Sequence, residues 1–450
     1  MKDFLTRILR LREGELGLVL TLGFLLISNS VAQQIAKIVS VSGFIKQEGS
    51  DVSQILVLWL IDMALILLLG ALQSLIVDRF ERKKLMRWMI VGLGLVYLGL
   101  RLMFSFELDG RIIYAIMFVL VDLQWMFYPL IFWILGNDVF DMAQAKRIFP
   151  LLASGSFFGK LVGIGFAAAA PSLFARLQIA DYEVLSLNVL IYIVSFLVIG
   201  IGLRNVRVRK TVVQKDSMRE TLTEGWEFVQ EVPSFRYLAL ATAAISVTLT
   251  INEFRFLVVS DGAFASQEAY QQFYGIYQLG LVVTSFLIQS FVTSRLIEAI
   301  KLKNAFIVHP AATLLGAIWM VVQTAIVGAT GCMILAKLTQ KTVDESARKA
   351  FQSVVPEERR GRVSIFIDSY LPAGATIVGS LITLAILFLL RLWPDRPFGD
   401  FYVYMAVSIL AGALAVWAAL KIRGVYDTSL FNWRLKRRQR GAGVLDGIDF

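Results

Sequence analysis

Several charged side chains interrupt long apolar stretches of the sequence, among them Lys37, Asp122, Lys160, Glu253 and Arg255. A charge at the centre of a bilayer costs about 2.5–3.5 kcal/mol even on the most lenient insertion scale. Residues of this kind are therefore typical of sites that handle ions or charged ligands inside membranes. The pattern predicts a functional site at membrane depth.

The depth of these charges within their apolar stretches differs. Asp122 and Lys160 lie near the middle of theirs, at a rise of 1.5 Å per helical residue. Lys37 follows a long apolar run, so it either faces the protein interior or snorkels to the outer surface. Glu253 and Arg255, in "TLTINEFRFLVV", lie two-thirds of the way along their segment. Their partners are either each other or the opposite half of the chain.

The composition indicates the class of protein. Hydrophobic residues make up 57% of the 450 residues, charged residues make up 17%, and the mean hydropathy is +0.69. Apolar residues come in blocks near membrane-spanning length, which is typical of a polytopic membrane protein. Cys332 is the one cysteine and His309, before Pro310, the one histidine. We expect His309 to be a satisfied interfacial residue, and we expect no enzyme activity, metal site or cofactor.

Twelve blocks are long enough to cross a hydrocarbon core of about 30 Å. They cover residues 16–44, 52–77, 85–106, 112–135, 149–170, 183–203, 235–259, 271–293, 304–327, 329–347, 363–390 and 400–421. Most lysines and arginines fall in alternate loops and at the two ends, so both termini are predicted to be cytoplasmic, in a bacterial inner membrane. The net charge of +10 is then explained by topology, and no nucleic-acid partner is expected.

The chain divides into two similar halves. Residues 1–203 and 235–421 each hold six spans, with a cytoplasmic linker at 204–234 and a basic cytoplasmic tail at 422–450. Polar positions of the first and seventh spans match at a constant offset: Ser28 with Ser246, Lys37 with Arg255, and Ser42 with Ser260. Such duplication places a shared cavity near the midplane between halves that move against each other, which predicts alternating access.

The loop "SLIVDRFERKKLM" follows the second span. Asp78, with Arg79 and Arg82, resembles the loop signature of the major facilitator superfamily, in which these charges latch helices in one conformation. Ser74 and Glu81 stand where the signature has glycines, and an ordinary positive-inside loop is the alternative. Together with the two halves, the loop predicts an all-α, major facilitator-type fold of two six-helix bundles with twelve transmembrane helices.

The segment "GSFFGKLVG" is not a phosphate-binding loop, because its glycines are too close together and Leu161 follows Lys160. Gly155, Gly159 and Gly163 instead recur every four residues. Small residues at this spacing allow a neighbouring helix to approach closely.

The stretch "LIFWILGNDVFDMAQAKRIFPLLASG", residues 130–155, carries an aromatic–Trp pair, an Asn, an acidic residue and then "AKR-aromatic-P-L". In order and spacing it resembles the end of the fourth span in the nucleotide transporter family typified by the ATP/ADP translocases of plastids and intracellular bacteria. "QQIAKIVSVSGF", "FVLVDLQW" and "TINEFRFLVVS" are similar to other segments of that family. The resemblance places Lys37, Asp122 and Glu253 at the family's matching positions.

The resemblance implies an anionic small-molecule substrate, a nucleotide, that is exchanged or taken up by alternating access. Cations in a low-dielectric cavity attract phosphates strongly, and Asp122 and Glu253 would pair with those cations in the empty site. The expected substrate site comprises Lys37, Asp122, Lys160, Glu253, Arg255, Gln33, Gln34 and Asn252, with the five charged residues facing one cavity. A cytoplasmic latch is expected at Asp78, Arg79, Arg82, Asn137, Asp138, Asp141, Lys146, Arg147, Asp344 and Arg348.

The sequence also departs from the translocases. Asp122 stands where they usually have Glu, Arg348 where they usually have Lys, and "YLPAGATIVGS" lacks a lysine expected near the eleventh span. A binding site with one cation fewer is consistent with a less charged substrate, a different nucleotide or another cargo. The alternatives are a facilitator-type carrier of another organic anion or lipid, and a non-transporting membrane scaffold or sensor. In each case we expect a monomer in a lipid bilayer.

Overall fold

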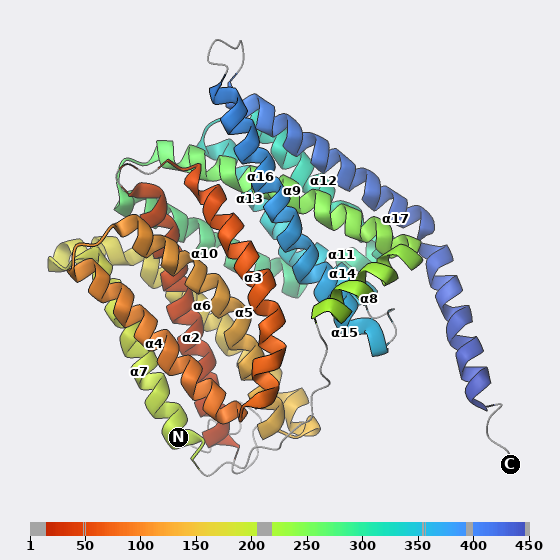
Figure 1. Cartoon of the computed structure of the whole chain (residues 1–450), viewed down its shortest axis with the longest axis horizontal. Coiled ribbons are helices and arrows are strands. Elements are labelled where there is room, and N and C mark those ends of the chain that lie inside the picture. The colour runs from red at the N-terminus through yellow and green to blue at the C-terminus, as the bar shows by residue number, and fades with distance from the viewer. Residues whose placement is uncertain are drawn as a thin grey trace. The chain divides into compact units, whose positions relative to one another are not determined.

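The structure is a computed structural model that describes residues 15–47, 49, 51–204, 218–352, 355, 357–392 and 399–445. Every regular element in these ranges is a helix (Figure 1). The predicted all-α class is therefore confirmed.

The chain forms two compact units by its internal contacts. Unit 1 contains α2 (Leu16–Lys46), α4 (Arg82–Ser105), α5 (Gly110–Val139), α6 (Met142–Leu177) and α7 (Val184–Gly202). Unit 2 contains α8 (Met218–Glu231), α9 (Pro233–Ala263), α11 (Thr293–Ile300), α12 (Leu302–Val322), α13 (Ile326–Thr339), α14 (Glu345–Gln352), α15 (Glu357–Ile365), α16 (Leu371–Arg391) and α17 (Asp400–Leu445). The helices α3 (Gln54–Arg79) and α10 (Gln267–Phe291) contribute one part to each unit. The predicted domain limits, which assign whole helices to each half, stay a prediction.

Ten helices in the described ranges are long and apolar enough to cross a membrane. They coincide with ten of the twelve predicted spans. The predicted span 52–77 falls on α3, whose shorter apolar part is Gln54–Gly70, and the predicted span 329–347 falls on α13 and the turn after it. Helices thus lie at all twelve predicted places, and the chain is an integral membrane protein by the length and composition of its helices.

The central helix of unit 1 is α2, which packs along α5, α6 and α7. Its hydroxyl side chains return their hydrogen bonds to its own backbone: Thr21 donates to the carbonyl of Gly17, Ser30 to that of Leu26 and Ser42 to that of Ile38. This pattern provides an acceptor for each hydroxyl within the apolar helix itself.

The crossing of α2 and α6 depends on the predicted glycine series. A Cβ atom on Gly159 would lie 2.6 Å from the carbonyl oxygen of Ile27, and one on Gly163 would lie 2.6 Å from that of Val31. Both distances are shorter than any real Cβ contact, so the two backbones approach as closely as glycine alone allows. The predicted close approach is confirmed.

Unit 2 is organised around α9, which packs along α17, α16 and α13. Two helical runs in this unit contain single π-helical turns, η2 (Gln340–Asp344) between α13 and α14, and η3 (Phe366–Tyr370) between α15 and α16. Such turns disturb the regular hydrogen bonding of a helix and occur frequently at functional sites.

The glycine crossing yields a stability prediction. Replacing Gly159 by Ala forces a methyl group against the Ile27 carbonyl, and overpacking of this kind costs about 1–3 kcal/mol. Gly165→Ala in the same helix is the matched control, because no atom lies within 4 Å of its Cβ position. Thermal unfolding of the purified protein in detergent is expected to occur at lower temperature for Gly159→Ala alone. Equal unfolding temperatures for the two variants would contradict the packing.

Candidate functional site

A closed polar network occupies the core of unit 1. The Gln124 amide donates to Asn29 Oδ1 at 2.8 Å and to the Tyr192 hydroxyl at 2.6 Å, and the Tyr97 hydroxyl donates to Gln124 Oε1 at 2.9 Å. All four side chains are buried and use their hydrogen bonds on one another. The network therefore specifies how α2, α4, α5 and α7 pack.

Two of the three predicted amide ligands, Gln33 and Gln34, lie on α2 beside this core, and the third lies in unit 2. Gln33 is buried and donates to the backbone carbonyl of Val121 at 3.3 Å, whereas Gln34 is half-buried beside Gly163. Asn252, in unit 2, is completely buried and accepts a hydrogen bond from Ser408 at 2.7 Å. Of the three amides, the structure leaves Gln34 the most accessible.

The predicted charged residues of unit 1 differ in their partners. Lys37 is half-buried in α2, and within the described residues its ammonium group has no ion pair or hydrogen bond. Asp122 in α5 and Lys160 in α6 are also half-buried, but neither is without an interaction partner. Lys37 is thus a cation inside a predicted span that forms no ion pair with any residue the structure describes.

The charged pair of α9 does not pair with itself. Glu253 forms an ion pair with Lys337 of α13 at 2.9 Å, while the Arg255 guanidinium lies 4.1 Å from the ring centroid of Phe401 and contacts the Tyr404 hydroxyl at 3.5 Å. Residues two apart on a helix do not face each other, which explains why Glu253 and Arg255 remain separate. Of the two alternatives for their partners, pairing with each other is not found among the described residues. The ion-pair partner of Glu253, Lys337, lies in the same half of the chain and not in the opposite one. Arg255, like Lys37, has no carboxylate partner in the part of the chain that the structure describes.

The described latch residues of unit 1 lie at the start of α4, at the end of α5 and in the first turns of α6. Arg82 Nε lies 3.6 Å from Asp138 Oδ2, and both side chains are buried. Asp141 instead begins α6 through a capping box with Gln144. Arg147 pairs with Glu15 at 2.7 Å, Asn137 and Lys146 are exposed, and the side chains of Asp78 and Arg79 lie outside the described residues.

The latch residues of unit 2 belong to a larger cluster. Arg348 Nε donates to Asp344 Oδ2 at 2.9 Å, and Arg348 Nη1 donates to Asp368 Oδ1 at 2.8 Å. Asp368 also accepts from Lys349 at 2.6 Å and from Gln352 at 2.9 Å. Burial alone would lower the pKa of Arg348, but the carboxylates of Asp344 and Asp368 outweigh it and raise the pKa. The guanidinium stays charged and ties α14 to the η3 turn.

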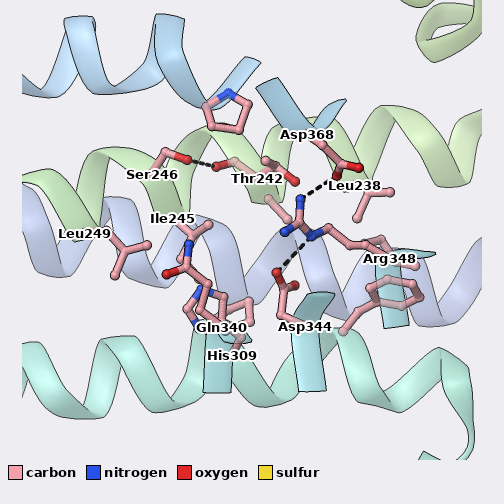
Figure 2. Close-up of a pocket in the computed structure, with 15 residues that line it drawn as sticks. Leu238, Thr242, Ile245, Ser246, Leu249, His309, Gln340, Asp344, Arg348 and Asp368 are labelled. Atoms are coloured by element: carbon pink, nitrogen blue, oxygen red, sulfur yellow. Dashed lines mark hydrogen bonds and ion pairs between the residues drawn. The ribbon is translucent and has the colours of Figure 1, made fainter. Parts of the chain in front are cut away.

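This cluster borders a cavity of about 120 Å³ inside unit 2. Figure 2 shows the Arg348 side chain between Asp344 and Asp368, with His309 and Gln340 together on another part of the wall. The remaining walls come from α9, α12, α16 and α17 and are mainly apolar: Leu238, Ala241, Ile245, Leu249, Phe306, Pro310, Pro372 and Ile422. Both π turns contribute to the wall, η2 through Gln340 and Asp344 and η3 through Asp368.

Sequence reasoning missed three of these groups. His309 is 2% exposed and borders the cavity, a position that its place beside Pro310 in the sequence did not indicate. Lys337 and Asp368 both lie within predicted spans, and a charge at membrane depth was the signal that could have identified them.

No protein-family model and no curated protein matches the chain. Solved structures are similar in fold: the nucleoside transporter NupG has a TM-score of 0.66 at 12% identity, covering 91% of this chain and 100% of that one. A bacterial homologue of the iron transporter ferroportin in an inward-facing state gives 0.63 at 16% identity over 92% and 99%, and an autoinhibited POT family peptide transporter gives 0.62 at 13% over 91% and 96%. At these identities the likeness shows the fold, which is of the predicted major facilitator type.

The Arg348 cluster yields a second stability prediction. Asp368→Asn removes the negative charge that accepts from Arg348, Lys349 and Gln352, and hydrogen bonds to charged groups contribute about 1.5–3 kcal/mol each. We expect thermal unfolding at a clearly lower temperature than in the parent. The control is Glu298→Gln, which removes an exposed carboxylate in the same unit. An Asp368→Asn protein as stable as the control would contradict the bracing role of the cluster.

Proposed function

We propose that this protein carries an anionic nucleotide across a membrane by alternating access. The observation that supports the proposal best is the state of two cations, Lys37 and Arg255. Each lies inside a membrane-spanning helix, and neither has a carboxylate partner within the described residues. An unpaired charge in that position costs free energy, so it is retained for a ligand of opposite charge.

Other cations of the spans and their ends show how this chain normally compensates such a charge. Arg101 pairs with Glu183, with its Nε 3.1 Å from Oε2, Lys337 pairs with Glu253, and Arg348 pairs with two aspartates. Lys37 and Arg255 have no such carboxylate partner among the described residues, and their positions match in the internal repeat. Because both halves have a cation without a carboxylate partner at this position, we propose that the feature belongs to the repeated six-helix unit.

The helices that carry these cations also support a ligand role. In the most apolar stretches of α2 and α9, 56% and 67% of the residues are buried, compared with at most 44% in the other candidate spans. Cations on the most buried helices are unsuited to snorkelling into lipid headgroups. We therefore propose that Lys37 and Arg255 meet a polyanion that enters the protein.

The nucleotide is the finer part of the proposal, and it rests on the sequence resemblance to the nucleotide transporters. A polyphosphate supplies several negative charges that two separate cations can share. We place the protein in a bacterial inner membrane with both termini cytoplasmic, as the distribution of basic residues predicts. A carrier of another organic anion uses the same two cations, so the choice of ligand is settled by binding measurements.

The proposal also revises the expected ion pairing. Glu253 was expected to neutralise a substrate-binding cation, and the cation it neutralises is Lys337. We propose that an incoming phosphate competes with Glu253 for Lys337, since both groups are anions that seek one ammonium. In this scheme the Glu253–Lys337 ion pair forms when the carrier is empty and is broken when a nucleotide is bound.

Lys37→Gln and Arg255→Gln are expected to weaken nucleotide binding. Each removes a charge-assisted contact worth about 1.5–3 kcal/mol, which corresponds to roughly a ten- to a hundredfold loss of affinity. Isothermal titration of the purified protein with ATP and ADP measures the loss.

The matched control is Arg295→Gln, an exposed cation of unit 2, which is expected to bind like the parent. If the parent bound ATP and both site variants bound it equally well, the phosphate role of these cations would be wrong. If the parent bound no nucleotide at all, the ligand would have to be another anion, or the protein would be a non-transporting membrane scaffold or sensor.

A further inference from the structure

The cavity in unit 2 has two chemically different parts. Its apolar walls, which include Leu238 and Ile422, suit the hydrophobic face of a ligand. Its polar edge contains His309 and Gln340, while Asp344, Arg348 and Asp368 are held by one another. Groups that already form strong ion pairs have little left to offer a ligand. The other polar side chains of the lining are His309, Gln340, Thr242 and Ser246, and the Ser246 hydroxyl hydrogen is used on the Thr242 carbonyl. We therefore consider His309 and Gln340 first.

The hydrogen bonds of His309 determine its tautomer. Thr313 donates its hydroxyl hydrogen to the His309 carbonyl at 2.9 Å, and Thr339 donates to the Leu335 carbonyl at 2.8 Å. Both hydroxyl oxygens are also near His309 Nδ1, at 3.3 Å and 3.0 Å. Since the threonine hydrogens are used in the shorter bonds, Nδ1 carries the proton and donates to a threonine oxygen. Nε2 is then a hydrogen-bond acceptor.

This acceptor has no donor within the described residues, although the His309 side chain is 2% exposed and borders the cavity. The side-chain amide of Gln340 likewise has no hydrogen bond to a described residue. Buried polar groups are normally paired. The cavity edge therefore offers a ligand the acceptor nitrogen of His309, and the NH2 group and carbonyl oxygen of Gln340.

The cavity also lies next to charged groups of unit 2. Thr242, Ser246 and Leu249 of α9 border it, and Glu253 follows on the same helical face at one further turn. On α13, Lys337 lies three residues before Gln340, which is about 4.5 Å along a helix axis. The Glu253–Lys337 ion pair therefore lies at the end of the cavity, along the two helices that wall it.

We infer that this cavity binds the heterocyclic base of the nucleotide, an inference that rests on the proposed function and assigns the base to a place of its own. A base is a flat ring with apolar faces and an edge of donors and acceptors, which matches apolar walls and a polar edge. Its sugar and phosphates then extend toward Lys337. An exocyclic amino group donates to His309 Nε2, and the adjacent ring nitrogen accepts from the Gln340 amide.

The pairing predicts which bases are preferred. Adenine and cytosine carry an amino group beside an unprotonated ring nitrogen, and uracil carries a carbonyl beside a ring N–H. In the seat that directs the amino group of adenine to His309 Nε2 and its ring nitrogen to the Gln340 amide, uracil has the opposite order of groups. Its carbonyl would face the acceptor Nε2 and its ring N–H would face the N–H of Gln340, so neither hydrogen bond would form. The parent protein is expected to bind ATP and CTP at least about tenfold more tightly than UTP.

The experiment measures the affinities of ATP, CTP, UTP and inorganic tripolyphosphate by isothermal titration. His309→Phe keeps a ring but removes the acceptor, and Gln340→Met keeps the length but removes the amide. In each variant the preference for ATP over UTP is expected to fall to less than about threefold, with tripolyphosphate affinity unchanged. The control Gln323→Met makes the same change at an exposed position of the same unit and retains the preference.

The outcomes separate the two proposals. If the parent binds nucleotides without discriminating ATP from UTP, or if folded His309→Phe and Gln340→Met proteins keep the discrimination, the base site is overturned and the nucleotide proposal stands. If the parent binds no nucleotide, the proposed function fails and the base site fails with it. Gln340→Met changes a half-buried residue, so it provides the test even where His309→Phe fails to fold.

Discussion

The cost of placing an ionised side chain in a membrane organises the described parts of both units. Each such charge has to be offset, and this chain does so mainly with ion pairs between neighbouring helices, as in Arg101 with Glu183 and Lys337 with Glu253. The pairs fix which helices are neighbours. Lys37 and Arg255 differ from these cations, because neither has a carboxylate partner among the described residues, and we propose that a bound anion compensates them.

Sequence reasoning succeeded where the signal is local. The length of an apolar block fixes a span, and the glycine series of α6 fixes a close crossing, because both depend on residues near one another in the chain. It failed for partners distant in sequence. Glu253 pairs with Lys337, 84 residues away, and periodicity contains no information about which helix faces α9. The π turns were also missed, since a single inserted residue leaves the apolar pattern almost unchanged.

The π turns connect the stability of unit 2 to its cavity. In η2 and η3 the regular helix is interrupted, and the Arg348 ion pairs with Asp344 and Asp368 hold the interrupted segments in place. The residues that brace the cavity are thus distinct from those that face its contents, His309 and Gln340. The Arg348 cluster, which the sequence predicts to be a latch, and the proposed base site are therefore adjacent but have different roles.

The central claim is that the unpaired cations exist to bind phosphates. Its most direct test is the affinity of the parent protein for the series adenosine, AMP, ADP and ATP, measured by isothermal titration at fixed ionic strength. Because each added phosphate brings further charge to Lys37 and Arg255, the account predicts that affinity rises along the series and that the rise is largely abolished in the Lys37→Gln/Arg255→Gln double variant. Adenosine binding as tightly as ATP in the parent would contradict it.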